Sequence, residues 1–162
     1  MIEQFKVLQN VKQLREDKAL RALQTARAEV ERAKARLLKA REAAEESART
    51  LPAREAQLFA EIMQRIVSLD DVDLVKKRVL ALMEDHQRML DKATRAQDHV
   101  KRSEDAADKA RIAYRAKQAE TEKINTITAE KTDQAALAAV AAEETEIEDL
   151  FSGKTRPIGE AA

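Results

Sequence analysis

No glycine precedes Gly153 in this 162-residue chain, and Pro52 is the one proline before it. Glycine and proline supply most of the tight turns that a compact domain needs. A chain with no glycine and a single proline over such a length favours long helices rather than many short elements. This scarcity of turn residues limits the possible folds more than any motif does.

The composition points the same way. Charged residues make up 37% of the chain and aromatic residues 2%, so bulky side chains for a globular core are scarce. Such compositions are typical of coiled coils and long helices. Thirty Lys and Arg residues balance thirty Asp and Glu residues. This balance gives no net field to attract nucleic acid or a membrane surface.

The sequence also limits the compartment. It contains no cysteine, which excludes disulfides and fits a reducing intracellular compartment. The start, MIEQFKVLQN, lacks the apolar segment of a secretory signal peptide. The longest apolar run, AALAAVAA at 135–142, is too short to span a bilayer. We therefore expect a soluble cytoplasmic protein without direct membrane insertion.

Two stretches show alternating steps of three and four residues, the spacing of a coiled-coil seam. The first seam comprises Leu23, Ala26, Val30, Ala33, Leu37, Ala40, Ala44, Ser47 and Leu51. The second comprises Val72, Val75, Val79, Leu82, His86, Met89, Ala93, Ala96, Val100, Ser103, Ala107, Ala110 and Tyr114. Weaker repeats continue through Ile124, Ala135, Ala138 and Ala142.

Between the seams the spacing loses its phase, which predicts a break. Ser68 and Asp71 resemble a weak capping box. Asp70, Asp71 and Asp73 are favourable near the positive end of a new helix. We place a turn at about 67–71. A helix that continues through this stretch is the alternative.

The predicted fold is all-α: a long antiparallel two-helix coiled-coil hairpin with a short disordered C-terminal tail. Helix one covers about 3–67, with a kink or short interruption at Pro52, and helix two about 71–150. Together they form one unit, 1–151, followed by the tail 152–162. A chain that folds back at about residue 69 places residue i opposite about residue 138 − i. The last dozen or so residues of helix two then extend past the N-terminus.

No catalytic constellation is present. Both glycines lie in the tail, so no Gly-rich phosphate loop exists. The two histidines, His86 and His99, are too far apart in sequence to form a metal pair on adjacent turns. His86 falls on the seam, where a hydrogen-bonded or partly solvated histidine is expected. We predict a protein that is not an enzyme and has no metal or cofactor.

Charge is distributed unevenly. Residues 1–50 carry 12 basic and 8 acidic side chains, whereas AAEETEIEDL at 141–150 carries five acids and no base. Acids at a helix C-terminus oppose the macrodipole. This helix end is expected to fray unless a basic surface contacts it. A solvated helix face with no partner is an equal alternative explanation of the acidic run.

Two groups of apolar residues suggest docking surfaces. One group flanks the turn. Its residues could instead form a local core that closes the hairpin. It comprises Phe59, Ile62, Met63, Ile66, Val67, Leu69, Val72, Leu74, Val75, Leu80, Leu82 and Met83. The other lies at the open end and comprises Ile2, Phe5, Leu8, Val11 and Leu14, with Ala135–Ala142, Ile147, Leu150 and Phe151 opposite.

Two segments carry a family resemblance. FKVLQNVKQLREDKALRALQTARAEVERAKARL, at the start, and LFAEIMQRIVSLDDVDLVKKRVLALMEDHQRMLDKA, in the middle, resemble the YscO/FliJ family of type III secretion and flagellar export proteins. The similarity spans about residues 2–150. Pro52 departs from the family pattern and puts the straightness of the first arm in doubt.

The resemblance implies an antiparallel two-helix coiled coil similar to the rotor gamma subunit of the rotary ATPases. Its open end inserts into the hexameric export ATPase and promotes assembly and activity. Family members also contact the export gate, and some bind export chaperones. The implied location is the bacterial cytoplasm, peripheral to the inner-membrane secretion apparatus, with no nucleic acid partner.

Carried over by position, the ATPase end comprises Phe5, Leu8, Val11, Arg15, Ile147 and Leu150. The hairpin-tip surface comprises Ile62, Met63, Leu69 and Leu74. Two other functions remain open: a structural coiled-coil scaffold or membrane-associated assembly protein, and a secreted coiled-coil effector.

Overall fold

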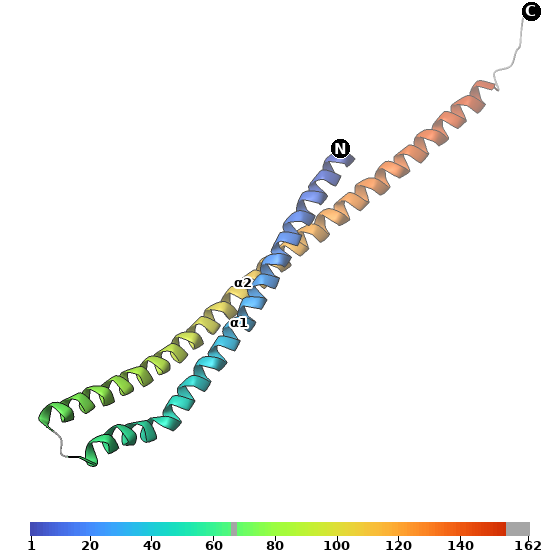
Figure 1. Ribbon diagram of the computed structural model, residues 1–162. Helices are drawn as coiled ribbons and strands as arrows, with labels where there is room; N and C mark the ends of the chain where they lie inside the picture. Colours follow the sequence, from blue (N-terminus) through green and yellow to red (C-terminus); the bar gives the residue numbers. More distant parts are fainter. Residues whose placement is uncertain (66–67, 155–162) are drawn as a thin grey trace, which may run out of the picture. The chain divides into compact units, whose positions relative to one another are not determined.

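Two long helices make up the protein. The computed structural model describes residues 1–65 and 68–154. In these ranges α1 runs over Ile2–Met63 (62 residues), α2 runs over Leu69–Lys154 (86 residues), and no strand occurs. The order and direction of the two helices are visible in Figure 1. The predicted all-α helical hairpin is confirmed.

Each helix contributes to two compact units. The tip unit comprises Arg21–Ile112 and contains the connection between α1 and α2. The end unit comprises Met1–Leu20 and Ala113–Ala162. We describe each unit separately.

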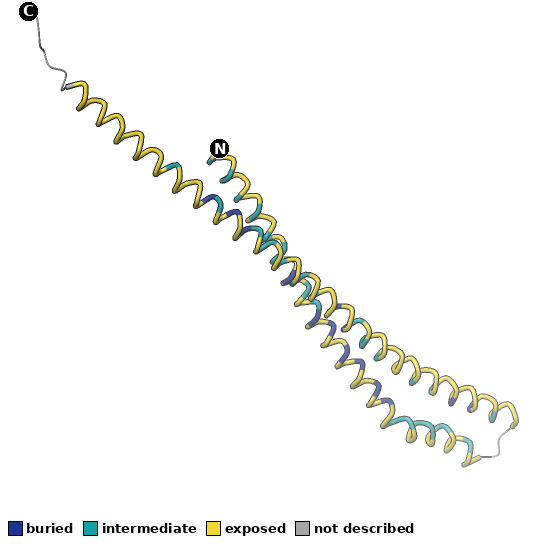
Figure 2. Tube along the Cα trace, turned by 180° about the vertical axis from the view of Figure 1, so that it is seen from behind, coloured by how far each residue is buried: buried dark blue, intermediate teal, exposed yellow. Residues whose placement is uncertain are grey.

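The seam of the tip unit is built from aliphatic and small side chains. Within it Ala33, Leu37 and Val100 form a buried cluster, against which Ala96 packs. Small side chains let two helix backbones approach closely. Of the first predicted seam, all but Ala26 and Leu51 are buried. The buried positions appear dark blue on the facing sides of the helices in Figure 2.

The end unit has a more polar seam. On α1 the side chains of Gln9 and Lys12 face α2, where Gln9 donates to Asn125 at 2.7 Å and Lys12 pairs with Glu120 at 3.0 Å. Residue numbers thus fall along α2 as they rise along α1, so the two stretches are antiparallel. The predicted rule opposes Gln9 with residue 138 − 9 = 129, four residues, or about one helical turn, from Asn125.

The turn begins earlier in the sequence than predicted. α1 ends at Met63 and α2 begins at Leu69, rather than at about 67 and 71. The predicted capping box is present: Asp71 N donates to Ser68 Oγ at 3.3 Å, and Ser68 N donates to Asp71 Oδ2 at 3.2 Å. This reciprocal pair satisfies two backbone N–H groups at the start of α2, which explains why the helix begins before residue 71. The expected turn residue Val67 lies outside the described residues.

Pro52 does not interrupt α1, so the predicted break is wrong and the predicted kink remains. Figure 1 shows α1 changing direction between its cyan and green parts. Proline removes one backbone hydrogen bond and crowds the preceding turn. Side chains stabilise this turn, because Thr50 Oγ1 donates to the Glu46 carbonyl at 2.9 Å and an Arg54 nitrogen donates to the Ser47 carbonyl at 3.2 Å.

The C-terminal boundary also differs from the prediction. α2 continues to Lys154, so Ser152 and Gly153 are helical rather than part of a tail that starts at residue 152. One glycine costs a helix only about 1 kcal/mol, and helix ends vary by one or two residues. The rest of the predicted tail, 155–162, lies outside the described residues.

Candidate interaction surfaces

The first candidate surface is the outward face of α1 in the end unit. Val7 and Leu14 are 62% and 66% exposed, and Leu8 and Val11 are also exposed. The same stretch turns Gln9 and Lys12 towards α2. An amphipathic helix normally buries its apolar side. This stretch turns half-buried polar side chains towards α2 and leaves an apolar stripe exposed for another surface.

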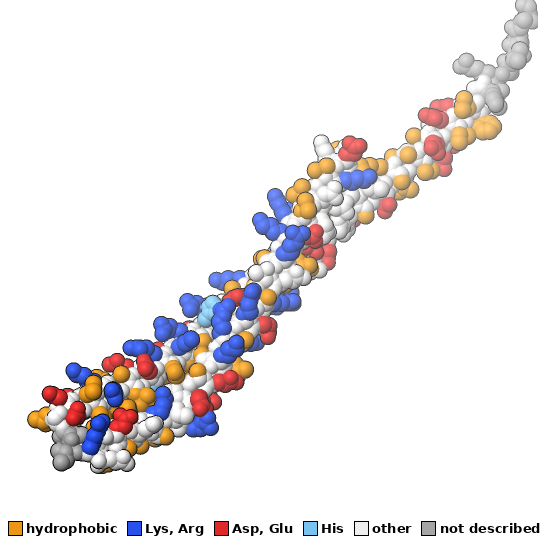
Figure 3. Space-filling model, viewed as in Figure 1, with side chains coloured by type: hydrophobic (Ala, Val, Ile, Leu, Met, Phe, Trp, Pro, Cys, Tyr) orange, Lys and Arg blue, Asp and Glu red, His pale blue; other side chains and the backbone are white. Residues whose placement is uncertain are grey.

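The second candidate surface, the free arm, is the stretch of α2 at residues 136–150. Met1, Ile2 and Phe5 of α1 lie beside Lys131, Gln134 and Ala135, where these residues line a pocket of about 370 Å³. With only residues 1–65 and 68–154 described, every residue of the free arm is exposed. Its apolar side chains are Leu137, Val140, Ile147 and Leu150, 52% to 70% exposed. Figure 3 shows hydrophobic and acidic side chains side by side on this end of α2.

The structure places the predicted ATPase-end residues on different surfaces. Phe5 lines the pocket against α2, whereas Leu8, Val11 and Arg15 are exposed on α1. The other two, Ile147 and Leu150, are exposed on the free arm. No described contact joins the α1 residues to those on the arm. The structure therefore gives two separate apolar stripes within the end unit rather than one patch.

The predicted tip residues lie at the ends of the two helices. Met63, the last residue of α1, is 86% exposed, and Leu69, the first of α2, is 84% exposed. Leu74 is also exposed, whereas Ile62 is half-buried. Ile66 and Val67, which the sequence placed in this group, lie outside the described residues. The described part of the tip thus has exposed apolar side chains at its helix ends.

Sequence reasoning missed two residues of these surfaces, Val7 and Leu137. Val7 falls in the same stripe as Val11 and Leu14, since steps of three and four residues share a helix face. Leu137 lies within the Ala-rich run at 135–142, whose composition predicts only a strip of small residues. A pairing of Met1 with residues near 135 would have identified Leu137 as uncovered.

In each unit an interaction between the two helices lowers the pKa of a glutamate. In the tip unit His99 Nε2 donates to Glu29 Oε1 at 3.2 Å, and this bond, with Arg36 and Arg32 nearby, lowers the pKa of Glu29. In the end unit the bond from Lys12, together with Lys117, lowers the pKa of Glu120.

The histidines have structural partners. His86 is half-buried on the seam and is hydrogen-bonded through Nδ1 to Ser47 Oγ at 2.9 Å. This agrees with the predicted hydrogen-bonded seam histidine. Throughout residues 1–65 and 68–154, no group of three His, Cys, Asp or Glu side chains could hold a metal ion. Neither described helix has a stretch long and apolar enough to cross a membrane.

Together the fold and its surfaces define a class of protein: an all-α helical hairpin whose exposed features are apolar stripes suited to contacts with other proteins. The family model of the type III secretion protein YscO matches residues 5–153. The chain therefore belongs to the YscO family of type III secretion proteins. This is a family of structural components of the secretion apparatus, not of enzymes.

A solved structure supports the same fold. The crystal structure of type III secretion protein YscO from Vibrio parahaemolyticus matches with a TM-score of 0.77 at 17% sequence identity. The match covers 96% of this chain and 94% of that one. A comparison with curated protein sequences finds no match.

Proposed function

We propose that this protein is the stalk of a type III export ATPase. Its end unit inserts into the ATPase hexamer and promotes the assembly and activity of that enzyme. The observation that carries the proposal is the free arm, a helix whose exposed apolar side chains no described segment covers. Exposed apolar stripes of this kind mark protein-binding surfaces. Membership of a secretion family supplies the kind of partner.

The end unit suits contact with a ring of subunits because it offers two separate stripes. Val7, Val11 and Leu14 face outward on α1, and Val140 and Ile147 lie on the free arm. Two stripes on different helices can contact more than one subunit. The protein itself supplies no reactive group in this role: it acts by binding.

The proposal has a direct test in ATP hydrolysis by the cognate type III ATPase. Addition of the purified protein should raise the turnover or the hexamer fraction of the ATPase. The double variant Ile147→Ser/Leu150→Ser should lose most of this stimulation. Absence of binding and stimulation by the unmodified protein over a wide range of concentrations would sink the proposal.

A matched control separates the arm from general surface hydrophobicity. Leu38 and Ile112, in the tip unit, are 60% and 62% exposed, close to the exposure of the arm residues. Leu38→Ser/Ile112→Ser removes a similar apolar area and should keep full stimulation. Equal loss in both variants would count against the arm as the binding site.

The hairpin tip is the proposed second contact, with the export gate and export chaperones as its candidate partners. Its described apolar residues are Ile62, Met63, Leu69 and Leu74, and Met63 and Leu69 are the most exposed. In this role the protein links the ATPase to the gate on the cytoplasmic side of the inner membrane. Met63→Ser/Leu69→Ser should weaken capture of gate or chaperone and leave ATPase stimulation intact. Unchanged capture of both would exclude the tip.

A further inference from the structure

The tip unit contains a hollow that the proposed function does not use. This basic groove, of about 750 Å³, lies between α1 and α2. Alanines form much of its lining, and basic side chains surround them. The lining comprises Ala33, Arg36, Lys39, Ala40, Ala43, Met89, Lys92, Arg95, Ala96 and His99.

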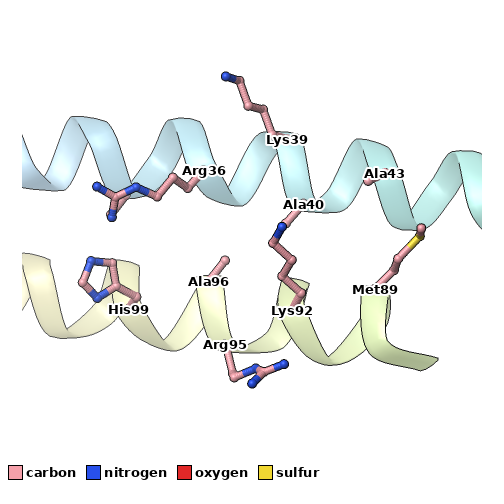
Figure 4. A pocket seen from close by; sticks show the side chains of 10 residues that line it. Arg36, Lys39, Ala40, Ala43, Met89, Lys92, Arg95, Ala96 and His99 are labelled. Carbon is pink, nitrogen blue, oxygen red and sulfur yellow. The ribbon is translucent and has the colours of Figure 1, made fainter. Parts of the chain in front are cut away.

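The groove carries uncompensated positive charge. None of its lining residues is acidic. Arg36 pairs with Glu29 at 3.3 Å, and His99 bonds to the same carboxylate. In contrast, Lys39, Lys92 and Arg95 have no carboxylate within 4.0 Å among the described residues. Figure 4 shows Lys39 and Arg95 extending on opposite sides of the groove, with Lys92 between the helices.

These features define the chemistry of an occupant. The alanine methyl groups give an apolar floor that another helix can approach closely, as in other Ala-rich helix contacts. Free cations on both sides favour an occupant with carboxylates on both flanks, because opposite charges across an interface fix orientation and partner choice. The groove therefore fits an acidic amphipathic helix.

The free arm has this chemistry. At about 100° per residue, Val140 and Ile147 lie within about 20° of each other around the helix. On the same scale Glu143 lies about 50° to one side of them and Glu148 about 90° to the other. The stretch 141–150 carries five acids and no base. In the described structure the arm has an apolar stripe with acids on both flanks and no helix against it.

We propose that the free arm of one copy docks in the basic groove of a second copy. Val140 and Ile147 lie on the alanine floor, and Glu143 and Glu148 pair with the cations on the two sides. The contact also places positive charge near a helix C-terminus that its own acids disfavour. It does not depend on the ATPase, and the same arm cannot occupy both sites at once.

Sedimentation of the purified chain alone, over concentrations up to about 1 mM, tests the proposal. The unmodified chain should associate as concentration rises. Lys39→Glu/Lys92→Glu/Arg95→Glu should weaken association about tenfold or more. Glu143→Lys/Glu144→Lys/Glu148→Lys should do the same, and a mixture of the two variants should associate again.

The control reverses three exposed lysines outside the groove, Lys76→Glu/Lys101→Glu/Lys109→Glu, and should leave association unchanged. A chain that stays monomeric throughout overturns the proposal. So does association that both triple reversals leave intact, or that the control weakens equally. A mixture that fails to associate overturns the pairing of arm and groove.

Cysteine cross-linking gives a second readout, because the natural chain has no cysteine. A mixture of the Lys92→Cys and Ile147→Cys chains should form a disulfide-linked heterodimer under mild oxidation. Lys109→Cys mixed with Ile147→Cys should form little. Equal yields from the two mixtures would contradict docking in the groove. These variants keep the unmodified charge elsewhere in the groove and arm, so they test the contact even if a triple reversal fails to fold.

Discussion

The tip unit and the end unit use the same two helices but bury different side chains. In the tip unit the buried seam contains Leu23, Val30, Leu37, Val75 and Val100. In the end unit the buried residues of α2 are Thr121, Ile124 and Thr128.

The difference shows how one hairpin can be stable and still available to partners. Burial of apolar area stabilises by roughly 25 cal/mol per Å², and a buried hydroxyl contributes less. The Thr128 hydroxyl donates to the Ile124 carbonyl of its own helix at 2.7 Å, so this bond adds nothing across the seam. We infer that the tip unit supplies most of the stability and the end unit supplies exposed contact surface.

The largest expected effect comes from the tip-unit core. Leu37→Ala should lower the free energy of unfolding by about 3 kcal/mol, because it leaves a cavity beside Ala33 and Val100. Urea unfolding followed by circular dichroism measures this loss. The neighbour Leu38 is 60% exposed, so Leu38→Ala is a matched control with a change under about 0.5 kcal/mol. Similar losses in both variants would break the comparison.

Replacement of Pro52, at the bend in α1, should give the second-largest change in stability. Pro52→Ala restores a backbone donor inside α1 and should raise the free energy of unfolding by about 2 kcal/mol. It sharpens the comparison, since the gain should fall on the tip unit. Hydrogen exchange should then slow in residues around the bend and stay unchanged in the end unit. A loss of stability would show that the bent helix is needed for packing.

Threonine replacement in the end unit should give a smaller gain. Thr128→Val removes only a bond within α2 and adds apolar area to the seam, so it should stabilise the end unit by about 1 kcal/mol. Thr121 also bonds to the Lys12 carbonyl of α1 at 3.3 Å, so Thr121→Val should gain less. Hydrogen exchange over residues 113–131 measures both. No gain from Thr128→Val would show that the polar seam does not limit this unit.

Acid gives the smallest effect. The pKa values of Glu29 and Glu120 are lowered from 4.5 by their bonds to His99 and Lys12. Stability from such groups is present above the ordinary pKa and is lost as the pH falls through the lowered value. The melting temperature of the unmodified protein should therefore fall between pH 7 and pH 3. The fall should be slightly smaller in the Glu29→Gln/Glu120→Gln variant. Both carboxylates are solvated, so salt should reduce the difference. An identical fall in both proteins would show that these two carboxylates do not contribute to stability.

The sequence predicted those parts of the fold that follow from helical periodicity. The first seam, from Leu23 to Ser47, and the capping pair Ser68 and Asp71 are found as expected. The spacing from Tyr114 also reaches Thr121 and Thr128, but a search for apolar residues passes over threonine. Periodicity gives the face of a helix, and it does not show where the partner helix ends.

The pairing at the open end shows this limit most clearly. An offset of about one turn at Gln9 brings Met1 beside Ala135 and leaves α2 longer beyond α1 than expected. For this reason Leu137 was not recognised as a surface residue. The predicted contacts of Leu8, Val11, Ile147 and Met63 with partners stay predictions, because exposure identifies an available surface and not its occupant.

The polar contact between buried Ser47 and half-buried His86 has a consequence for the alignment of the two helices. A seam that repeats every seven residues permits several offsets with similar apolar packing. A slip by one heptad would set Ser47 against Val79 or Ala93 and leave its hydroxyl without a cross-helix partner. Arg54 also donates to this hydroxyl at 3.2 Å, but it lies on α1 with Ser47 and keeps that bond in any alignment, so the bond to His86 is the one that a slip would break. A single hydroxyl near the bend thus helps select one sliding position of the two helices from many near-equivalents.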